Sequence, residues 1–472
     1  MRIPGHILTA ILALALVPGA AAQSAPAGPP ASPSPATLSS ARDSRIVAAL
    51  RQVSAARIRA NIEKLAGFGT RHTLSAADAE AVRSGRGIGA AREWIKQEFE
   101  SYSRACGGCL EVEFQSFTQG TSERVPQPTE IVNVVATLRG TDPANAGRLY
   151  VVTGHYDSRN SDPLDATGDA PGANDDASGT AVSLECARVL SQHRFPATIV
   201  FMAVAGEEQG LFGSRYFART AREKNLNLGG VLNNDIVGGN RTPGDTLQNR
   251  NLVRVFSEGI PLNATEQELR LIRATGGEND SASRQLARYI RDTARLYLRG
   301  PFAPMPVFRR DRYLRGGDHT PFNEFGYAAV RFTEFREDYN HQHQNPRTEK
   351  GIEYGDLPRF VDYEYVANVA RLNAATLASL AAAPAPPANV RLLTKELEND
   401  STLVWEPSPG GLATGYEVLW RSTTAPYWEN VKPVGNVTRA TLKMSKDNVI
   451  LAVRAVGAQG HRSLAVVPTP ER

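Results

Sequence analysis

The sequence predicts an α/β domain with a mostly parallel, twisted sheet and helices on both faces, followed by a C-terminal all-β sandwich. Residues 149–153 and 198–204 are short apolar runs, typical of strands that are buried on both faces. Segments with a helical period separate such runs, as in a sheet whose strands are joined by helices. Residues 389–472 show short alternating segments without a helical period, which favours a sandwich.

Length and charge limit the classes of protein that fit. The chain has 472 residues, of which 41% are hydrophobic and 22% charged, so two or three globular domains are expected. The net charge is only +4 and no run of Lys or Arg stands out. Nothing in the charge pattern therefore favours nucleic acid as a partner.

The N-terminus is typical of a secretory signal peptide at residues 1–22. Arg2 precedes an apolar run at 7–17, and residues 20–22 are alanines suited to cleavage. The alternatives are an N-terminal anchor or a core helix, but the run is short for a transmembrane segment and no other stretch is apolar enough. We therefore expect an exported protein, periplasmic or extracellular. Residues 23–40, rich in Pro, Ala and Ser, are expected to form a flexible leader.

The three cysteines fit an exported protein. Cys106 and Cys109 form a C-x-x-C pair, which we interpret as a local disulfide because no second pair exists to complete a zinc site. A thioredoxin-like redox motif is a weaker alternative. Cys186 lies in an apolar helical stretch and is expected to be a buried thiol.

The first domain is placed at residues 41–383. Its predicted elements are, in order, helices at 41–65 and 87–102, strands at 110–117, 131–138 and 149–153, a helix at 178–192, a strand at 198–204, a helix at 211–224, a strand from 230 and a closing helix at 363–380. The polar, Arg-rich stretch 238–315 is expected to form surface helices and loops that shape a pocket. A Pro-rich linker at 384–388 should follow, and then the sandwich at 389–472, with strands at 401–405, 415–420, 439–442 and 449–455.

Polar motifs follow the predicted strands or open the next loop. In chain order they contain His155 and Asp157, Asp175 and Asp176, Glu207 and Glu208, Asp235, and finally His341 and His343. Each has a structural interpretation: a lone His-x-Asp is often structural, adjacent aspartates suit a helix N-cap, and adjacent glutamates suit a first helical turn.

The order of the motifs favours a metal site over these separate interpretations. Side chains that follow successive parallel strands converge at one edge of a sheet. Imidazole and carboxylate are a ligand set suited to zinc, and a carboxylate shared by two ions fits metals about 3.5–4 Å apart. A further carboxylate would then serve as general base.

The sequence resembles the dinuclear-zinc aminopeptidases of metallopeptidase family twenty-eight. The matching segments are GHYDS, GANDDASGTA, AGEEQGLFGS, NND and GDHTPF, with GFGTRHT and GIGAARE before them, spanning roughly residues 58–380. The resemblance implies two zinc ions as cofactors and hydrolysis of N-terminal residues from peptide substrates. Glutaminyl cyclases share the fold but bind one zinc, and a second exopeptidase group inserts a lid domain that the stretch 238–315 does not resemble.

The resemblance also implies a role for each motif residue. His155 and Asp235 would bind one zinc, Glu208 and a late histidine the other, and Asp175 would bridge them. Glu207 would be the general base and Asp157 would orient His155, and the peptide bond between Asp175 and Asp176 is often strained in this family.

The departure from the family pattern lies at the late histidine. The family usually has a Tyr-His pair followed by an acid, whereas here Tyr339 and Asn340 precede His341-Gln342-His343. Either histidine could be the ligand, and we favour His343. His319 in the GDHTPF segment is expected to support the pocket instead.

Two other functions stay open. A carboxypeptidase or dipeptidase would need a basic group for the substrate carboxylate, which the insert could supply from Arg309, Arg310, Arg312 or Arg315. A non-catalytic binding protein is disfavoured by the intact Glu207-Glu208 pair.

The C-terminal sandwich resembles a fibronectin type III domain. Trp405 fits the early core tryptophan and Tyr416 the middle strand, although Val449 stands where a tyrosine is usual. By analogy alone, this domain could attach the protein to a surface or polymer.

Overall fold

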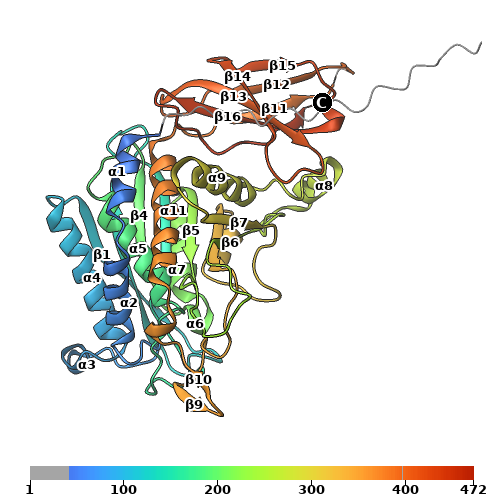
Figure 1. Ribbon diagram of the computed structural model, residues 1–472. Coiled ribbons are helices and arrows are strands. Elements are labelled where there is room, and N and C mark those ends of the chain that lie inside the picture. Colours follow the sequence, from blue (N-terminus) through green and yellow to red (C-terminus); the bar gives the residue numbers. More distant parts are fainter. Residues whose placement is uncertain (1–41, 396, 472) are drawn as a thin grey trace, which may run out of the picture. The chain divides into compact units, whose positions relative to one another are not determined.

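The computed structural model describes residues 42–395 and 397–471, so the predicted signal peptide and leader lie outside the described residues. The first domain contains an eight-stranded sheet in the order β1-β2-β4-β3-β5-β8-β6-β7. Figure 1 labels β1, β4, β5, β6 and β7 of this sheet. The strands are β1 (Leu110–Gln119), β2 (Thr129–Leu138), β3 (Arg148–His155), β4 (Thr198–Val204), β5 (Asn227–Asn234), β6 (Leu252–Ser257), β7 (Ala303–Val307) and β8 (Ala329–Glu334). The central strands β4, β3, β5 and β8 are parallel, which confirms the predicted fold class.

Helices cover both faces of the sheet because alternate residues of each central strand point to opposite sides. Val152 and Phe201 belong to the larger apolar core, which they share with one set of helices. Val151 and Val200 belong to a second core on the opposite face. The first set comprises α1 (Ser44–Gln52), α2 (Ala55–Ala66), α4 (Gly87–Ala105), α5 (Ala177–Leu190), α9 (Ala282–Tyr297) and α11 (Tyr363–Ala382), and the second comprises α7 (Phe212–Glu223) and α10 (His319–Glu324).

Two parts of the first domain differ from the prediction. The helix expected at 41–65 is divided into two helices. α1 ends at Gln52, and the side chain of Ser54 caps the start of α2. The stretch 238–315 does more than form surface helices and loops: it adds β6 and β7 to the sheet and contributes the packed helix α9. Val253 and Val255 of β6 are fully buried, but polar neighbours in the sequence hide this short alternation.

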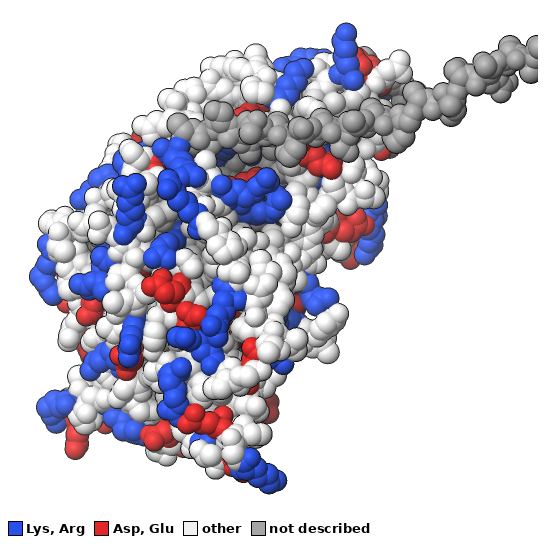
Figure 2. Space-filling view, viewed as in Figure 1, with Lys and Arg blue, Asp and Glu red and all other residues white. Residues whose placement is uncertain are grey.

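The smaller elements lie between these strands and helices. They are α3 (Ala79–Ser84), α6 (Glu207–Gly210), α8 (Glu266–Thr275), the hairpin β9 (Arg347–Glu349) and β10 (Ile352–Tyr354), and a 3₁₀ turn at Pro358–Phe360. No helix among the described residues is long and apolar enough to cross a membrane. On the face shown in Figure 2, acidic and basic side chains are interspersed with uncharged surface.

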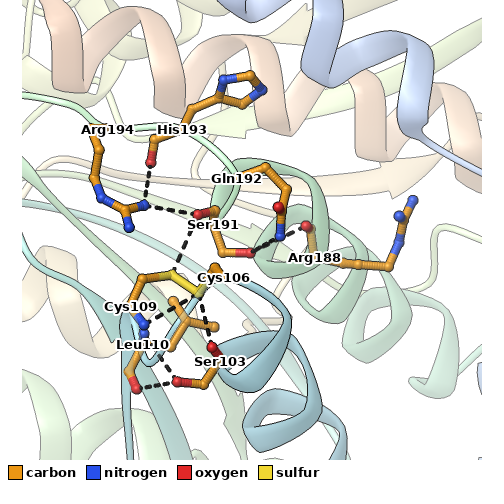
Figure 3. Close-up of a disulfide and its surroundings, with 9 residues drawn as sticks. All are labelled: Ser103, Cys106, Cys109, Leu110, Arg188, Ser191, Gln192, His193 and Arg194. Atoms are coloured by element: carbon orange, nitrogen blue, oxygen red, sulfur yellow. Dashed lines mark hydrogen bonds between the residues drawn. A yellow bond between two sulfur atoms is a disulfide. The ribbon is translucent and has the colours of Figure 1, made fainter.

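The predicted disulfide is confirmed. Cys106 and Cys109 are bonded between the end of α4 and the start of β1, beside the carbonyl oxygen of Ser191 (Figure 3). Cys186 is a buried free thiol in α5, as expected.

The C-terminal region forms two sheets that pack as a sandwich. One sheet has the order β15-β12-β11-β17 and the other β14-β13-β16. The strands are β11 (Ala388–Leu393), β12 (Ser401–Glu406), β13 (Ala413–Ser422), β14 (Asn430–Gly435), β15 (Arg439–Leu442), β16 (Val449–Gly457) and β17 (Thr469–Glu471). Trp405 and Tyr416 pack in the shared core with ring centroids 5.5 Å apart, as the resemblance implied.

The segment before the sandwich is buried, unlike a free linker. Ala383 is fully buried and Ala385 is 4% exposed. A guanidinium N–H of Arg148 donates to the carbonyl oxygen of Ala383 at 2.7 Å. Ala383 is therefore held against the first domain, and the two residues after it are also buried.

Glu258 follows β6 and is buried, so its titration tests the structure at this end of the sheet. Burial raises its pKa to about 7, from an ordinary 4.5. The folded chain then retains a proton that the unfolded chain loses, so Glu258 makes the fold less stable as the pH rises from 4.5 to about 7. We predict that Glu258→Gln stabilises the protein at pH 8 by roughly 1–3 kcal/mol, since one pKa unit corresponds to about 1.4 kcal/mol.

The measurement is urea unfolding of both proteins between pH 4 and pH 8. The difference in unfolding free energy should shrink towards pH 4. A difference that is constant across this range would contradict the assignment.

Candidate metal centre

The polar motifs meet at the carboxyl edge of the parallel strands, as predicted. His155 is the last residue of β3, Glu207 follows the end of β4, and Asp235 follows β5. Gly206 has a φ of +76°, a conformation that glycine adopts without steric cost, and it turns the chain from β4 into α6. Parallel neighbours end at the same side of the sheet, so three segments distant in sequence deliver their side chains to one place.

Two groups of candidate metal ligands form there. In one, ligand atoms of His155, Glu207 and Asp235 all lie within 4.8 Å of one another. In the other, the same holds for Asp175, Glu208 and His343, and Nε2 of His343 is 3.0 Å from Glu208 Oε1. Each group combines imidazole with carboxylates, the donor set that suits zinc.

Asp175 belongs to the second group and also reaches the first. Its Oδ1 is 3.1 Å from His155 Nε2 and its Oδ2 is 2.9 Å from His343 Nε2. One carboxylate therefore faces a histidine from each group, the arrangement expected of a bridging ligand.

The adjacent Asp176 has a different task. It caps α5 by accepting the N–H of Gly179 at 2.8 Å, and its other oxygen accepts the N–H of His155 at 3.0 Å. The peptide bond between Asp175 and Asp176 is cis. The N-cap interpretation thus applies to Asp176, while Asp175 faces the two groups.

Asp157 lies behind His155 and beneath the Glu207-Glu208 pair. His155 Nδ1 lies 3.1 Å from the backbone carbonyl oxygen of Asp157 and 3.5 Å from its Oδ1, and Thr73 donates a hydrogen bond to Asp157 Oδ2 at 2.9 Å. The backbone N–H groups of Glu207 and Glu208 also point to this carboxylate, at 3.4 and 3.2 Å. Asp157 can therefore fix both the ring of His155 and the start of α6.

The two late histidines are separated by their surroundings. His343 reaches the second group, and its φ of +56° is rare for a residue other than glycine. His341 instead stacks on Phe360 with ring centroids 3.8 Å apart. The geometry supports His343 as the ligand.

Several buried atoms of the two groups lie 2.9–3.1 Å from a polar atom of a neighbouring side chain, yet none of these contacts has the geometry of a hydrogen bond within the described part of the chain. They are Nε2 of His155, Nε2 of His343 and Oε1 of Glu208. Buried polar atoms are nearly always satisfied, so the orphaned atoms point to a bound cation. Burial alone would lower the pKa of His343, yet Glu208 and Asp175 raise it to about 10, which shows how strongly this place attracts positive charge.

Glu207 is the acid of the two ligand groups whose pKa is raised, whereas the pKa values of Asp175 and Asp235 are lowered. Burial, and then the neighbouring charges of Asp235 and Glu208, raise the pKa of Glu207 well above the ordinary value, although His155 opposes this. A carboxylate with raised proton affinity beside a metal group suits a general base.

The structure adds residues that the sequence motifs did not identify. Arg331 of β8 is fully buried, with one nitrogen 2.9 Å from Asp235 Oδ1 and another 3.1 Å from Asp311 Oδ2. Asp356 accepts the backbone N–H groups of Asn174 and Asp175. Both act on motif residues from far along the chain, and neither lies in a recognisable motif.

Arg159 and Gln342 are further additions within the site. Arg159 Nε is 3.1 Å from Glu208 Oε2, and its Nη2 lies 2.7 Å from His343 Nδ1. Gln342 donates to Asp175 Oδ2 at 2.9 Å. In the sequence, only their positions beside motif residues could have identified them. Arg159 follows GHYDS, and Gln342 separates the two histidines.

The GDHTPF segment supports the site from one side. Asp318 accepts a hydrogen bond from the hydroxyl of Ser214, and burial raises its pKa to about 7. His319 lies 2.9 Å from the carbonyl oxygen of Arg310, and burial lowers its pKa to about 4. His319 is not part of either group, as expected.

Removal of Arg331 tests the charge balance of the site. We predict that Arg331→Met lowers the unfolding free energy of chelator-treated protein by about 3–5 kcal/mol, because two buried carboxylates lose their partner. Arg336→Met is the matched control: Arg336 pairs with Asp245 but is 46% exposed, so its loss should cost less than about 1 kcal/mol. Equal losses in denaturant unfolding would contradict the assignment.

Comparison with known proteins agrees with these features. Residues 133–363 match the model of Peptidase family M28. A "Probable zinc metalloprotease" of Leptosphaeria maculans is 48% identical over 435 residues, 91% of this chain and 98% of the relative. A protein of the same name from Pyricularia oryzae is 48% identical over 453 residues, covering 94% of this chain and 88% of its own.

Solved structures are more distant in sequence. The LapA aminopeptidase of Legionella pneumophila is 20% identical with a TM-score of 0.48, covering 73% of this chain and 78% of its own. BSAP, a zinc aminopeptidase from Bacillus subtilis, is 15% identical with a TM-score of 0.47, covering 69% of this chain and 94% of its own. With close relatives aligned over nearly their whole length, the chain belongs to peptidase family M28 and is a zinc-dependent peptidase.

Proposed function

We propose that this chain is an exported aminopeptidase that uses two zinc ions to remove N-terminal residues from peptides. The observation that carries the proposal is the position of Asp175 between two ligand groups, each with one histidine. One ion would be bound by His155 and Asp235, the other by Glu208 and His343, with Asp175 shared. Bound zinc supplies a Lewis acid and an activated water at such a site.

The protein residues have separate tasks in this proposal. Glu207 accepts the proton of the attacking water and later gives a proton to the leaving amine. Asp157 holds the backbone N–H groups of Glu207 and Glu208 and orients the ring of His155. Asp356 and Gln342 fix Asp175 through its backbone and its side chain.

Specificity for the N-terminus follows from the charge of the site. Glu207 and Asp318 are further carboxyl groups beside the ligands, and their raised pKa values mean that they hold protons readily. A free substrate ammonium group would favour the ionised form of these acids and pair with them, whereas a blocked N-terminus would not.

A dipeptidase or carboxypeptidase is the second candidate, and Arg159 is the observation that favours it. Its guanidinium lies beside Glu208 and His343, where a substrate carboxylate would pair with it. Of the insert arginines considered for this role, Arg312 is engaged by Asp311 and Glu337. Arg159 is itself paired with Glu208, so a substrate carboxylate would compete with Glu208 for its guanidinium.

Export is supported by two features. The first 22 residues have the pattern of a signal peptide, and the Cys106–Cys109 disulfide suits an oxidising compartment. Attachment of the sandwich to a surface or polymer stays a prediction.

Cleavage of one peptide in two forms tests the proposal. The peptide carries a free or an acetylated N-terminus, and mass spectrometry follows the products with and without a zinc chelator. We predict chelator-sensitive, stepwise loss of residues from the free N-terminus only. Glu207→Gln should lower the rate by about 10²–10⁴-fold, because the general base is lost while the ligands stay.

Other outcomes point elsewhere. Shortening of both peptides from the C-terminus, abolished by Arg159→Ala, would favour the carboxypeptidase. A Glu207→Gln variant of near-normal rate would show that Glu207 is not the base.

The two late histidines form a matched pair for a zinc measurement. His343→Ala should lower the bound zinc from two ions to one per chain, because a neutral methyl cannot ligate the metal. His341→Ala should retain both ions, since His341 stacks on Phe360. Metal analysis of the purified variants checks this, and the reverse result would make His341 the ligand.

A further inference from the structure

The C-terminal sandwich contacts the first domain through the loop between β13 and β14, which reaches Gln285 of α9 and Phe308. The loop comprises residues 423–429, between β13 and β14, and we name it the contact loop. We propose that the sandwich is a positioning element of the metal centre. Through α9 and Phe308, the contact loop fixes the segment 309–317 that keeps Arg331 against Asp235.

The first step is a buried ion-pair cluster between the two domains. Arg421, at the end of β13, donates two hydrogen bonds to Asp280, at 2.8 and 2.9 Å. Arg288 of α9 lies 3.1 Å from the same carboxylate. All three side chains are only 3–4% exposed, so removal of one leaves charge buried without its partner.

The second step is a set of aromatic contacts made by the contact loop. Tyr427 packs edge-on against Phe308 with ring centroids 6.1 Å apart. The guanidinium of Arg291 lies 3.8 Å from the Tyr427 ring centroid. Trp428 donates its ring N–H to Gln285 at 3.3 Å, which adds a second contact with α9. The contact loop therefore packs on both α9 and Phe308, the residue that follows β7.

The third step leads from Phe308 to the metal centre. The carbonyl oxygen of Arg309 accepts the N–H of Ser257 at 3.0 Å, so the chain leaves the sheet edge in a fixed direction. Two residues later Asp311 pairs with Arg331, and the carbonyl oxygen of Gly316 accepts a further hydrogen bond from Arg331 at 2.9 Å. Arg331 in turn lies 2.9 Å from Asp235, a residue of the first ligand group.

Other features agree with a fixed sandwich. His461 lies 3.0 Å from Asp43, and Asn145 donates to the carbonyl oxygen of Gly410 at 2.9 Å, so the contact loop is not the sole attachment. The segment 383–385 is buried rather than free. In the Leptosphaeria maculans relative the match covers 91% of this chain, so it extends into the sandwich. The proposal rests on the metal centre but not on N-terminal specificity.

Zinc retention of the full chain tests the proposal. The variants are Arg421→Ala and Trp428→Ala, and Lys432→Ala is the control because Lys432 is an exposed cation on β14 of the same sandwich. Each is made in the His343→Ala background, where the ion at the first group should be the one that remains. A chromophoric chelator is titrated against the zinc-loaded protein, and circular dichroism reports the fold.

We expect Arg421→Ala and Trp428→Ala to release this ion at up to about tenfold lower chelator concentration, because they act through Arg331, and loss of a partner that contacts a ligand changes affinity by about 10–100-fold. Lys432→Ala should match its parent. Loss of thermal stability with unchanged zinc retention would overturn the proposal, because the contact would then be structural only.

Two milder substitutions decide the question if the alanine variants do not fold. Arg421→Lys keeps the charge without the paired hydrogen bonds, and Trp428→Phe keeps a ring without its N–H donor. Intermediate zinc retention in both supports the proposal, and parental retention in both overturns it. The titration needs no peptide cleavage, so failure of the proposed aminopeptidase activity would be seen separately, as zinc binding without turnover.

Discussion

Buried carboxylates at one edge of a sheet are the constraint on which the rest of this structure depends. Asp175, Glu208 and Asp235 are at most 5% exposed, and such charges are costly to bury unless they are paired or bind metal. The positive charge of Arg331 offsets the charge of Asp235, and His155 and His343 face the other carboxylates. The remaining negative charge is the physical reason that the site requires cations.

The fold brings these groups together through close backbone packing. A side chain at Gly154, beside His155, would place its Cβ 2.3 Å from the carbonyl carbon of Gly179 in α5. Glycine at both positions lets α5 approach β3, so that Asp176 reaches the backbone of His155. Asp175 is thereby held next to the histidine that ends the strand.

Local pattern was enough to predict the parts of the structure that lie within short segments. β3 and β4 were predicted from apolar runs, and His155 and Glu207, which come two and three residues after those runs, lie at the ends of these strands in the structure. The role of Arg331 could not be predicted, because it consists of ion pairs with Asp235 and Asp311, which approach Arg331 only in the folded chain. β6 and the contacts of the sandwich were missed for the same reason: their burial is set by partners far along the sequence.

The central claim is that two zinc ions share Asp175. Anomalous diffraction from crystals of the zinc-loaded protein at the zinc absorption edge tests it most directly. Two peaks about 3.5–4 Å apart are predicted, one beside His155 and Asp235 and the other beside Glu208 and His343, with Asp175 between them. A single peak at full zinc loading, or a pair of peaks that Asp175 does not contact, would contradict the claim.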